Sequence, residues 1–228
     1  MELVFDIGYN VGNFSREILR LYPDCHILGV EANNNLLQQP FSSNITLIAA
    51  LVYSKDGCKI DLHIDEAQNG ISTASEQFMQ LSRFRKGSRI QTICSWDRVE
   101  KVDTITLDTL IKRYGHPDLI KLDIEGGEYS ALLGLTAKQN LISFEWSEEL
   151  FFIVEDCVKY LNFLGYKEFC VAGYFEEGDV FQYLEYDPRA ETPGLIPRKF
   201  FKWEELQEDL KKMLHPERRM NYGMVFAT

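Results

Sequence analysis

Two glycines in a short segment near the start of the chain could hold the anionic end of a ligand. Residues 4–12 read Val-Phe-Asp-Ile-Gly-Tyr-Asn-Val-Gly, an apolar run that leads into a turn and then into a predicted helix. Gly8 and Gly12 have no Cβ, so the backbone can take unusual dihedral angles and a ligand can lie against it. A helix N-terminus attracts anions, and ligands of open α/β sheets lie beyond the carboxyl ends of the strands. We therefore expect a ligand carboxylate or phosphate over residues 8–13.

The glycine spacing favours an aminoacyl ligand over a dinucleotide. A dinucleotide fingerprint is Gly-x-Gly-x-x-Gly, whereas this turn offers Asp-x-Gly-x-x-x-Gly, beginning at Asp6. With an acid just before the turn, the zwitterionic end of S-adenosylmethionine fits better than a pyrophosphate. Glu31 follows the second predicted strand, 25 residues after Asp6, which is the distance at which nucleotide-binding units present an acid to ribose hydroxyls. An NAD-linked oxidoreductase is the alternative that this spacing disfavours.

Methyl transfer from a sulfonium requires the acceptor and the methyl group to be aligned at attack distance with water kept out. An alcohol acceptor must also lose a proton, and Asp123 leaves the fourth predicted strand at the expected edge, with Lys121 two residues earlier on the same face. A carboxylate with a pKa of about 4 is a weak base toward an alcohol. Either proton loss follows methyl transfer while Asp123 orients the hydroxyl, or a divalent cation lowers the pKa of the acceptor.

The metal alternative would use carboxylates at two strand ends. Asp123 and Glu145 could ligate Mg²⁺, which prefers oxygen ligands, but we expect a reaction without metal. Glu125 and Glu128 either line the pocket or stabilise the following helix through its dipole. We take Asp123, Lys121 and Glu125 as the candidate catalytic residues.

Three stretches resemble the FkbM-type S-adenosylmethionine-dependent methyltransferases. They are residues 6–15 (Asp-Ile-Gly-Tyr-Asn-Val-Gly-Asn-Phe-Ser), residues 29–33 (Gly-Val-Glu-Ala-Asn) and residues 104–128. The Lys-x-Asp-x-Glu-Gly sequence at 121–126 is the most specific of these matches, which together span about residues 3 to 150. The resemblance implies the class I methyltransferase fold: a Rossmann-like, doubly wound α/β fold with a mostly parallel seven-stranded sheet and an antiparallel strand near one edge.

The turn and the resemblance together predict the cofactor site. The candidate residues for binding S-adenosylmethionine are Asp6, Gly8, Tyr9, Asn10, Gly12, Asn13, Glu31, Ala32, Ala50, Leu51 and Asp123. The turn residues would hold the methionine end, Glu31 the ribose, and the exit of the third strand the adenine. The fourth strand lacks the two prolines and the aromatic residue that follow it in methylases of nucleobase amines, so we expect oxygen as the acceptor atom. The acceptor would be a hydroxyl of a sugar, a glycan or another small metabolite, and a non-catalytic nucleoside-binding module is the alternative outside catalysis.

The remaining pattern predicts the elements that position these residues. Strands are predicted at 2–7, 25–30, 45–51, 119–123, 141–146, 166–171, 180–186 and 222–227, with an antiparallel strand or hairpin at 59–64. Helices are predicted at 13–22, 36–39, 106–115, 154–164 and 206–214 and after Gly127, where Leu132 and Leu133 would be buried. Asn13 or Ser15 would cap the first helix and Thr106 the third. The inserted region at 54–102 and a loop at 187–202 would face the acceptor.

Length, charge and cysteines limit the class of protein. The chain has 228 residues, enough for one domain spanning 1–228. Lys and Arg number 24 and Asp and Glu 35, giving a net charge of −11, so long nucleic acid is an unexpected partner. The cluster of Arg83, Arg85, Lys86 and Arg89 is interpreted as a solvated mobile loop in preference to a patch for an anionic acceptor. Five scattered cysteines indicate a reducing compartment and no structural zinc, and no segment is suited to span a membrane, so we expect a soluble, cytoplasmic protein.

Overall fold

A seven-stranded sheet with helices on both faces forms the body of the computed structural model, which describes residues 1–68, 70–87, 93–174, 197, 200–207 and 222–228. The strand order is β3-β2-β1-β7-β8-β10-β9. The bounds are β1 Leu3–Ile7, β2 His26–Glu31, β3 Ile45–Ala49, β7 Leu119–Leu122, β8 Ile142–Ser147, β9 Phe169–Tyr174 and β10 Tyr222–Ala227. All pairs are parallel except those of β10, which runs antiparallel to both β8 and β9. The predicted Rossmann-like architecture is therefore confirmed.

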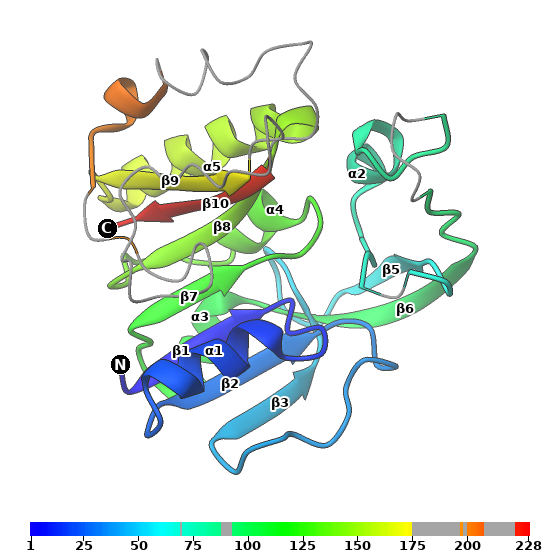
Figure 1. Cartoon of the computed structure of the whole chain (residues 1–228), viewed down its shortest axis with the longest axis horizontal. Helices are drawn as coiled ribbons and strands as arrows, with labels where there is room; N and C mark the ends of the chain where they lie inside the picture. The colour runs from blue at the N-terminus through cyan, green and yellow to red at the C-terminus, as the bar shows by residue number, and fades with distance from the viewer. Residues whose placement is uncertain (69, 88–92, 175–196, 198–199, 208–221) are drawn as a thin grey trace.

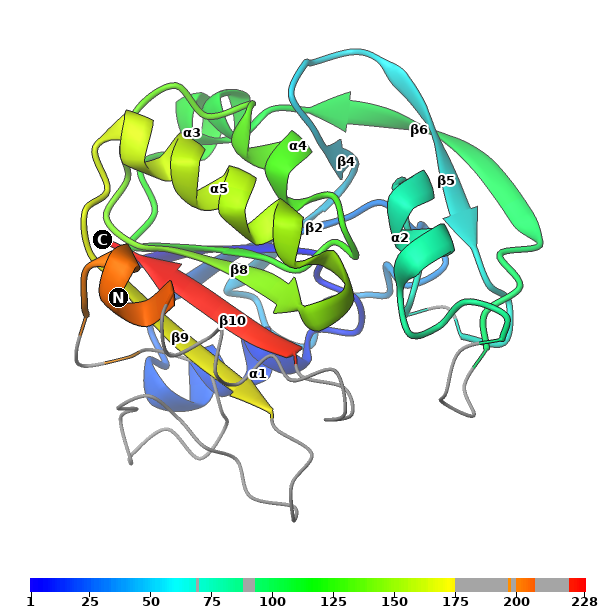
Figure 2. The same ribbon diagram turned by 90° about the horizontal axis from the view of Figure 1, so that it is seen from above.

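The central strands are buried because helices cover both sides of the sheet. All four residues of β7 and the last four of β1 are buried, as expected for parallel strands with no solvent-facing side. Helix α1 (Asn13–Leu21) lies on one face, while α3 (Leu107–Tyr114), α4 (Glu128–Leu132) and α5 (Phe151–Leu164) lie on the other (Figure 2). A short 3₁₀ helix, η1 (Glu148–Leu150), leads into α5.

The chain reverses its direction across the sheet between β1 and β7. From β1 it passes through α1 to β2 on one side, whereas β7 pairs with β1 on the other side, with Asp6 opposite Lys121. Ligands of such sheets bind at the carboxyl ends of the two strands that flank this point. The fold therefore places the glycine turn after β1 next to the acidic segment after β7.

A second, three-stranded sheet lies beside the carboxyl ends of the large one (Figure 1). It contains β4 (Leu51–Val52), β6 (Arg98–Ile105) and β5 (Lys59–Ile64), and β5 pairs antiparallel with β6. The prediction of one strand at 45–51 is wrong, because Ala49 is the last residue paired with β2, opposite Glu31, and Leu51 already pairs with Thr104 of β6 in the small sheet. Helix α2 (Glu76–Leu81), capped by Ser75, and strand β6 were not predicted.

The helix ends show which local signals were read correctly. Thr106 caps α3 and Gly115 ends it, as predicted. Neither Asn13 nor Ser15 caps α1, which begins after Gly12 without a side-chain cap.

Other local predictions fail or cannot be compared. Residues 36–39 form no helix, since a turn at 34–36 is followed by irregular chain. Leu133 is 39% exposed, and the strand predicted at 166–171 lies at Phe169–Tyr174. The predicted strand at 180–186 lies outside the described residues, as do Arg89 and most of 187–202 and 206–214. Within the described part of the chain, no helix has both the length and the apolar character needed to cross a bilayer.

Candidate active site

A cavity of about 310 Å³ opens where the carboxyl ends of β1, β2 and β7 meet the small sheet. That volume is at the lower end of the range for small-molecule and cofactor sites. Its wall is made of the turn after β1, the ends of β2 and β4, the segment after β5 and the loop after β7. The lining residues are Ile7, Gly8, Tyr9, Asn10, Asn13, Phe14, Val30, Glu31, Ala32, Leu36, Ala50, Leu51, Val52, Leu62, Gly70, Ser72, Ala74, Lys121, Asp123, Ile124, Glu125 and Met224.

The turn after β1 needs glycine at its first position. Gly8 has a φ of 79°, and a Cβ there would overlap the backbone carbonyl of Asp123. The amides of Gly8 and Tyr9 both donate to the carbonyl of Val30, at 2.9 and 3.1 Å. Asn10 also has a positive φ, of 51°. The turn is thus fixed against β2 on one side and against the end of β7 on the other, with its backbone along the cavity.

Glu31 closes the cavity at the end of β2. Glu31 is only 8% exposed. Its Oε2 accepts a hydrogen bond from the amide of Asn10 at 2.9 Å, and its Oε1 accepts one from the amide of Asn33 at 2.8 Å. Burial raises the pKa of Glu31, and these two amides oppose that rise. Each carboxylate oxygen keeps further acceptor capacity. The geometry therefore suits a diol at this end of the cavity.

Lys121 lies between two carboxylates beneath the turn. Its Nζ is 3.2 Å from Asp6 Oδ1 and 3.2 Å from Asp123 Oδ2. Burial lowers the pKa of Lys121, but the charges of Asp123 and Asp6 outweigh it, and the pKa lies above its ordinary value. Burial raises the pKa of Asp6, opposed by Lys121 and by the hydroxyl of Ser15. The ammonium is therefore held in its charged form at neutral pH.

Most of the predicted site residues meet at this cavity. Asp6 and Gly12 are the two predicted cofactor-binding residues that do not line it: Asp6 is fully buried under the turn, and Gly12, with a φ of 80°, precedes α1. Their effect on a ligand would pass through the shape of the turn. Which of the lining residues contact the cofactor stays a prediction.

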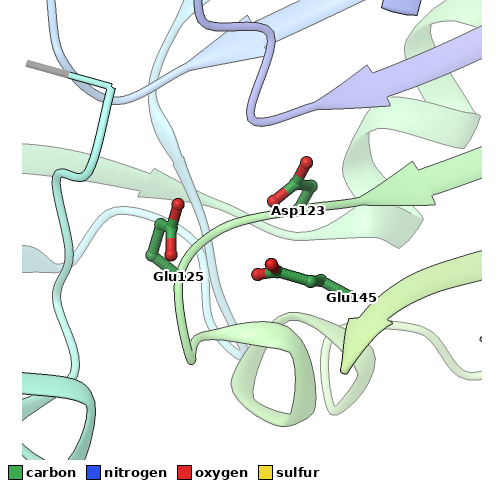
Figure 3. A group of neighbouring side chains, drawn as sticks. All are labelled: Asp123, Glu125 and Glu145. Carbon is green, nitrogen blue, oxygen red and sulfur yellow. The ribbon is translucent and has the colours of Figure 1, made fainter. Parts of the chain in front are cut away.

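Three carboxylates converge beside the cavity, at the loop after β7. Asp123, Glu125 and Glu145 each offer an oxygen, and these oxygens lie within 4.8 Å of one another around a common space between the loop after β7 and the end of β8 (Figure 3). Burial, followed by repulsion from neighbouring acids, holds the pKa values of Glu125 and Glu145 well above their ordinary value. The structure therefore places Glu145 next to Asp123, the two residues named as possible metal ligands from the sequence, and adds Glu125 as a third carboxylate.

The inserted segment fixes the conformation of Glu125. This residue has a φ of 53°, and Gly126 follows with a φ of 90°. Thr73 is 1% exposed, and its hydroxyl donates to the carbonyl of Glu125 at 2.7 Å. Ser72 Oγ accepts from Asn33 Nδ2 at 3.0 Å. Neither Ser72 nor Thr73 was identified from the sequence, because nothing local in an Asn-Gly-Ile-Ser-Thr stretch shows that it lies across a pocket.

The basic cluster divides into different environments. Arg83 is not a solvated loop residue: its side chain is 9% exposed, it pairs with Glu149 at 3.0 Å, and it lies 4.8 Å from the ring centre of Tyr222. That part of the prediction is wrong, because the turn after α2 places Arg83 against Glu149 of η1 and Tyr222 of β10. Arg85 and Lys86 are exposed, as predicted.

The fold is that of a class I methyltransferase: the sheet is mostly parallel, with one antiparallel strand next to its edge, and the cavity lies at the ends of β1 and β7, where the chain reverses its direction across the sheet. The Methyltransferase FkbM domain model matches residues 6–175, which are 170 of the 228 residues, and the chain belongs to this family. The protein is therefore a methyltransferase, and S-adenosylmethionine is its methyl donor.

Among solved structures, the chain is similar to a precorrin-6Y C5,15-methyltransferase from Geobacter metallireducens GS-15. The TM-score is 0.45 and the identity 13%, over 100% of this chain and 78% of the other. A comparison with curated proteins gave no match.

Proposed function

We propose that the protein is an O-methyltransferase whose acceptor is a hydroxyl group of a sugar, a glycan or another small metabolite. The observation that carries this proposal is the continuity of one cavity from the glycine turn and Glu31 to the carboxylates Asp123 and Glu125. S-adenosylmethionine, when bound, supplies an electrophilic methyl group for an in-line displacement. The chain's own residues then have to hold the cofactor, orient the hydroxyl and receive a proton.

The lining residues fit the three parts of the cofactor. The N-terminus of α1 at Asn13 would receive the methionine carboxylate, and the turn Gly8–Asn10, whose amides donate to Val30 and Glu31, would shape the space beside it. Glu31 would accept hydrogen bonds from the ribose hydroxyls. Small and apolar side chains at Ala32, Leu51 and Val52 would contact the adenine.

Asp123 would orient the acceptor hydroxyl, since it lines the cavity and Lys121 holds its carboxylate. A carboxyl whose pKa is raised is a stronger base than an ordinary one, so Glu125 or Glu145 could receive the hydroxyl proton. The concentration of carboxylates also disfavours phosphorylated or carboxylated acceptors, because the two nearby cations, Lys121 and Arg83, already face acids. A neutral hydroxyl acceptor is consistent with this charge pattern.

A second candidate is a metal-assisted O-methyltransferase. It is favoured by the three convergent oxygens of Asp123, Glu125 and Glu145, an all-oxygen set of the kind that Mg²⁺ binds. A cation there would lower the pKa of the acceptor hydroxyl. The proposal without metal and this candidate differ in their response to a chelator.

The test is transfer of a labelled methyl group from S-adenosylmethionine to a panel of neutral sugars, glycans and hydroxylated metabolites, with amine-bearing and phosphorylated analogues as controls. We expect transfer to a neutral hydroxyl that persists in EDTA and falls by roughly 10²-fold in Asp123→Asn, which weakens the group that orients the hydroxyl. Loss of activity in EDTA with recovery in Mg²⁺ would support the metal-assisted candidate. Transfer to amines alone would contradict O-methylation, and tight cofactor binding without any turnover would support a non-catalytic module.

A further inference from the structure

The amino group of Lys121 is engaged on three sides. Besides its two ion pairs, Nζ donates to the carbonyl oxygen of Gly8 at 3.2 Å. An ammonium has three donors, and here three acceptors surround it: Asp6, Asp123 and the turn itself. The side chain is only 8% exposed, so little water competes for these contacts.

A second layer supports this lysine from outside the cavity. Asp6 faces Lys121 across the β1–β7 pair and is fully buried, and its Oδ2 accepts from the hydroxyl of Ser15 at 2.7 Å. Asp6 Oδ1 has Lys121 as its ionic partner and no hydrogen-bond partner among the described residues. Ser15 is buried in α1 and does not line the cavity. A continuous polar chain therefore runs from α1 through two strands to Asp123.

We propose that Lys121 is a positioning residue that fixes the cofactor-binding turn and the Asp123 carboxylate relative to each other, with Ser15 as a remote member of the same network. The inference rests on the proposed function of the cavity as the cofactor site. Because Lys121 donates to Gly8 and forms ion pairs with Asp6 and Asp123, it acts through these groups and not on the reacting atoms. Contact between the turn and β7 reinforces the link, since the Gly8 Cα lies against the Asp123 carbonyl.

The network predicts that removing a hydroxyl outside the cavity weakens a ligand inside it. S-adenosylhomocysteine is the probe, and calorimetry at 25 °C on folded protein measures its affinity. Ser15→Ala should weaken binding about three- to tenfold, and Lys121→Met at least about tenfold, within or above the range of couplings carried by packed networks. Tyr160→Phe is the matched control: it loses a hydrogen bond to the carbonyl of Leu135, away from the cavity, and should lower Tm but leave affinity unchanged.

Lys121→Met leaves Asp6 as a buried unpaired charge and can fail to fold. In that event Asp6→Asn/Lys121→Met, which removes the buried carboxylate with its partner, should fold and show the same weakened binding. Wild-type affinity in the Lys121 variant and in Ser15→Ala, with a lowered Tm, would overturn the positioning role alone. A wild-type protein that binds neither S-adenosylhomocysteine nor S-adenosylmethionine would overturn the proposed function, and this inference with it.

Discussion

The contact between the glycine turn and the end of β7 can be tested by adding a single methyl group. Gly8→Ala places a Cβ at a position with a φ of 79° and against the carbonyl of Asp123. Gly57 is a matched control, because its φ is 69° and a Cβ there would meet no atom within 4 Å. Both substitutions carry the cost of a left-handed conformation, about 1–2 kcal/mol. Only Gly8→Ala also forces two backbone segments apart.

The difference between the two variants isolates the overlap. Overpacking of this kind costs about 1–3 kcal/mol, so Gly8→Ala should be less stable than Gly57→Ala by that amount. In a chain of this size 1 kcal/mol shifts Tm by about 2–4 °C, which gives a difference of about 2–12 °C. Thermal unfolding followed by circular dichroism measures both, and calorimetry should show weaker S-adenosylhomocysteine binding in Gly8→Ala alone. Equal Tm values and equal affinities would refute the close approach of the turn to β7.

Two further predictions concern buried charges. Burial raises the pKa of Glu128 to about 7 from an ordinary 4.5. Between these two pH values the folded state holds a proton that the unfolded state has lost. The free energy of unfolding should therefore be highest below pH 4.5 and fall by about 3 kcal/mol as pH rises through 7. Glu128→Gln should flatten that fall in denaturant titrations from pH 4.5 to 8, and a wild-type profile that rises over this window would contradict the assignment. Arg83→Met leaves the carboxylate of Glu149 without this partner and should lower the free energy of unfolding by about 2 kcal/mol, or Tm by about 4–8 °C. Lys159→Met is the control: the ion pair of Lys159 with Asp156 is exposed, so Tm should not change. Equal Tm values for these two variants would show that the Arg83 pair does not stabilise the contact between the segment after α2 and η1.

The strand, turn and helix at the start of the chain could be predicted because their signals are local. An apolar run, two glycines and a helical period define β1, its turn and α1 without knowledge of the partners. The acids Glu31 and Asp123 could be placed at one edge because both follow strands of a parallel sheet. The family resemblance then supplied the mostly parallel seven-stranded sheet with an antiparallel strand near one edge.

The parts that failed depend on partners distant in sequence. Residues 45–51 read as one strand, and only their partners show the division: Ala49 pairs with Glu31 of β2, and Leu51 pairs with Thr104 of β6. The sequence shows that Asp6 is an acid before a turn, but its burial follows from the register that sets Lys121 opposite it. Arg83 belongs to a basic cluster that reads as solvated, and its partner Glu149 lies 66 residues away.

In the proposed site, the cavity binds the nucleoside of S-adenosylmethionine with Glu31 on the ribose. Calorimetric titration of the wild type and of Glu31→Ala with S-adenosylhomocysteine, and of the wild type with NAD, tests it most directly. We predict that S-adenosylhomocysteine binds, that NAD does not, and that Glu31→Ala weakens binding roughly 10- to 100-fold, as expected for hydrogen bonds to a charged group. Binding of NAD in place of S-adenosylhomocysteine, or unchanged affinity in folded Glu31→Ala, would contradict the account.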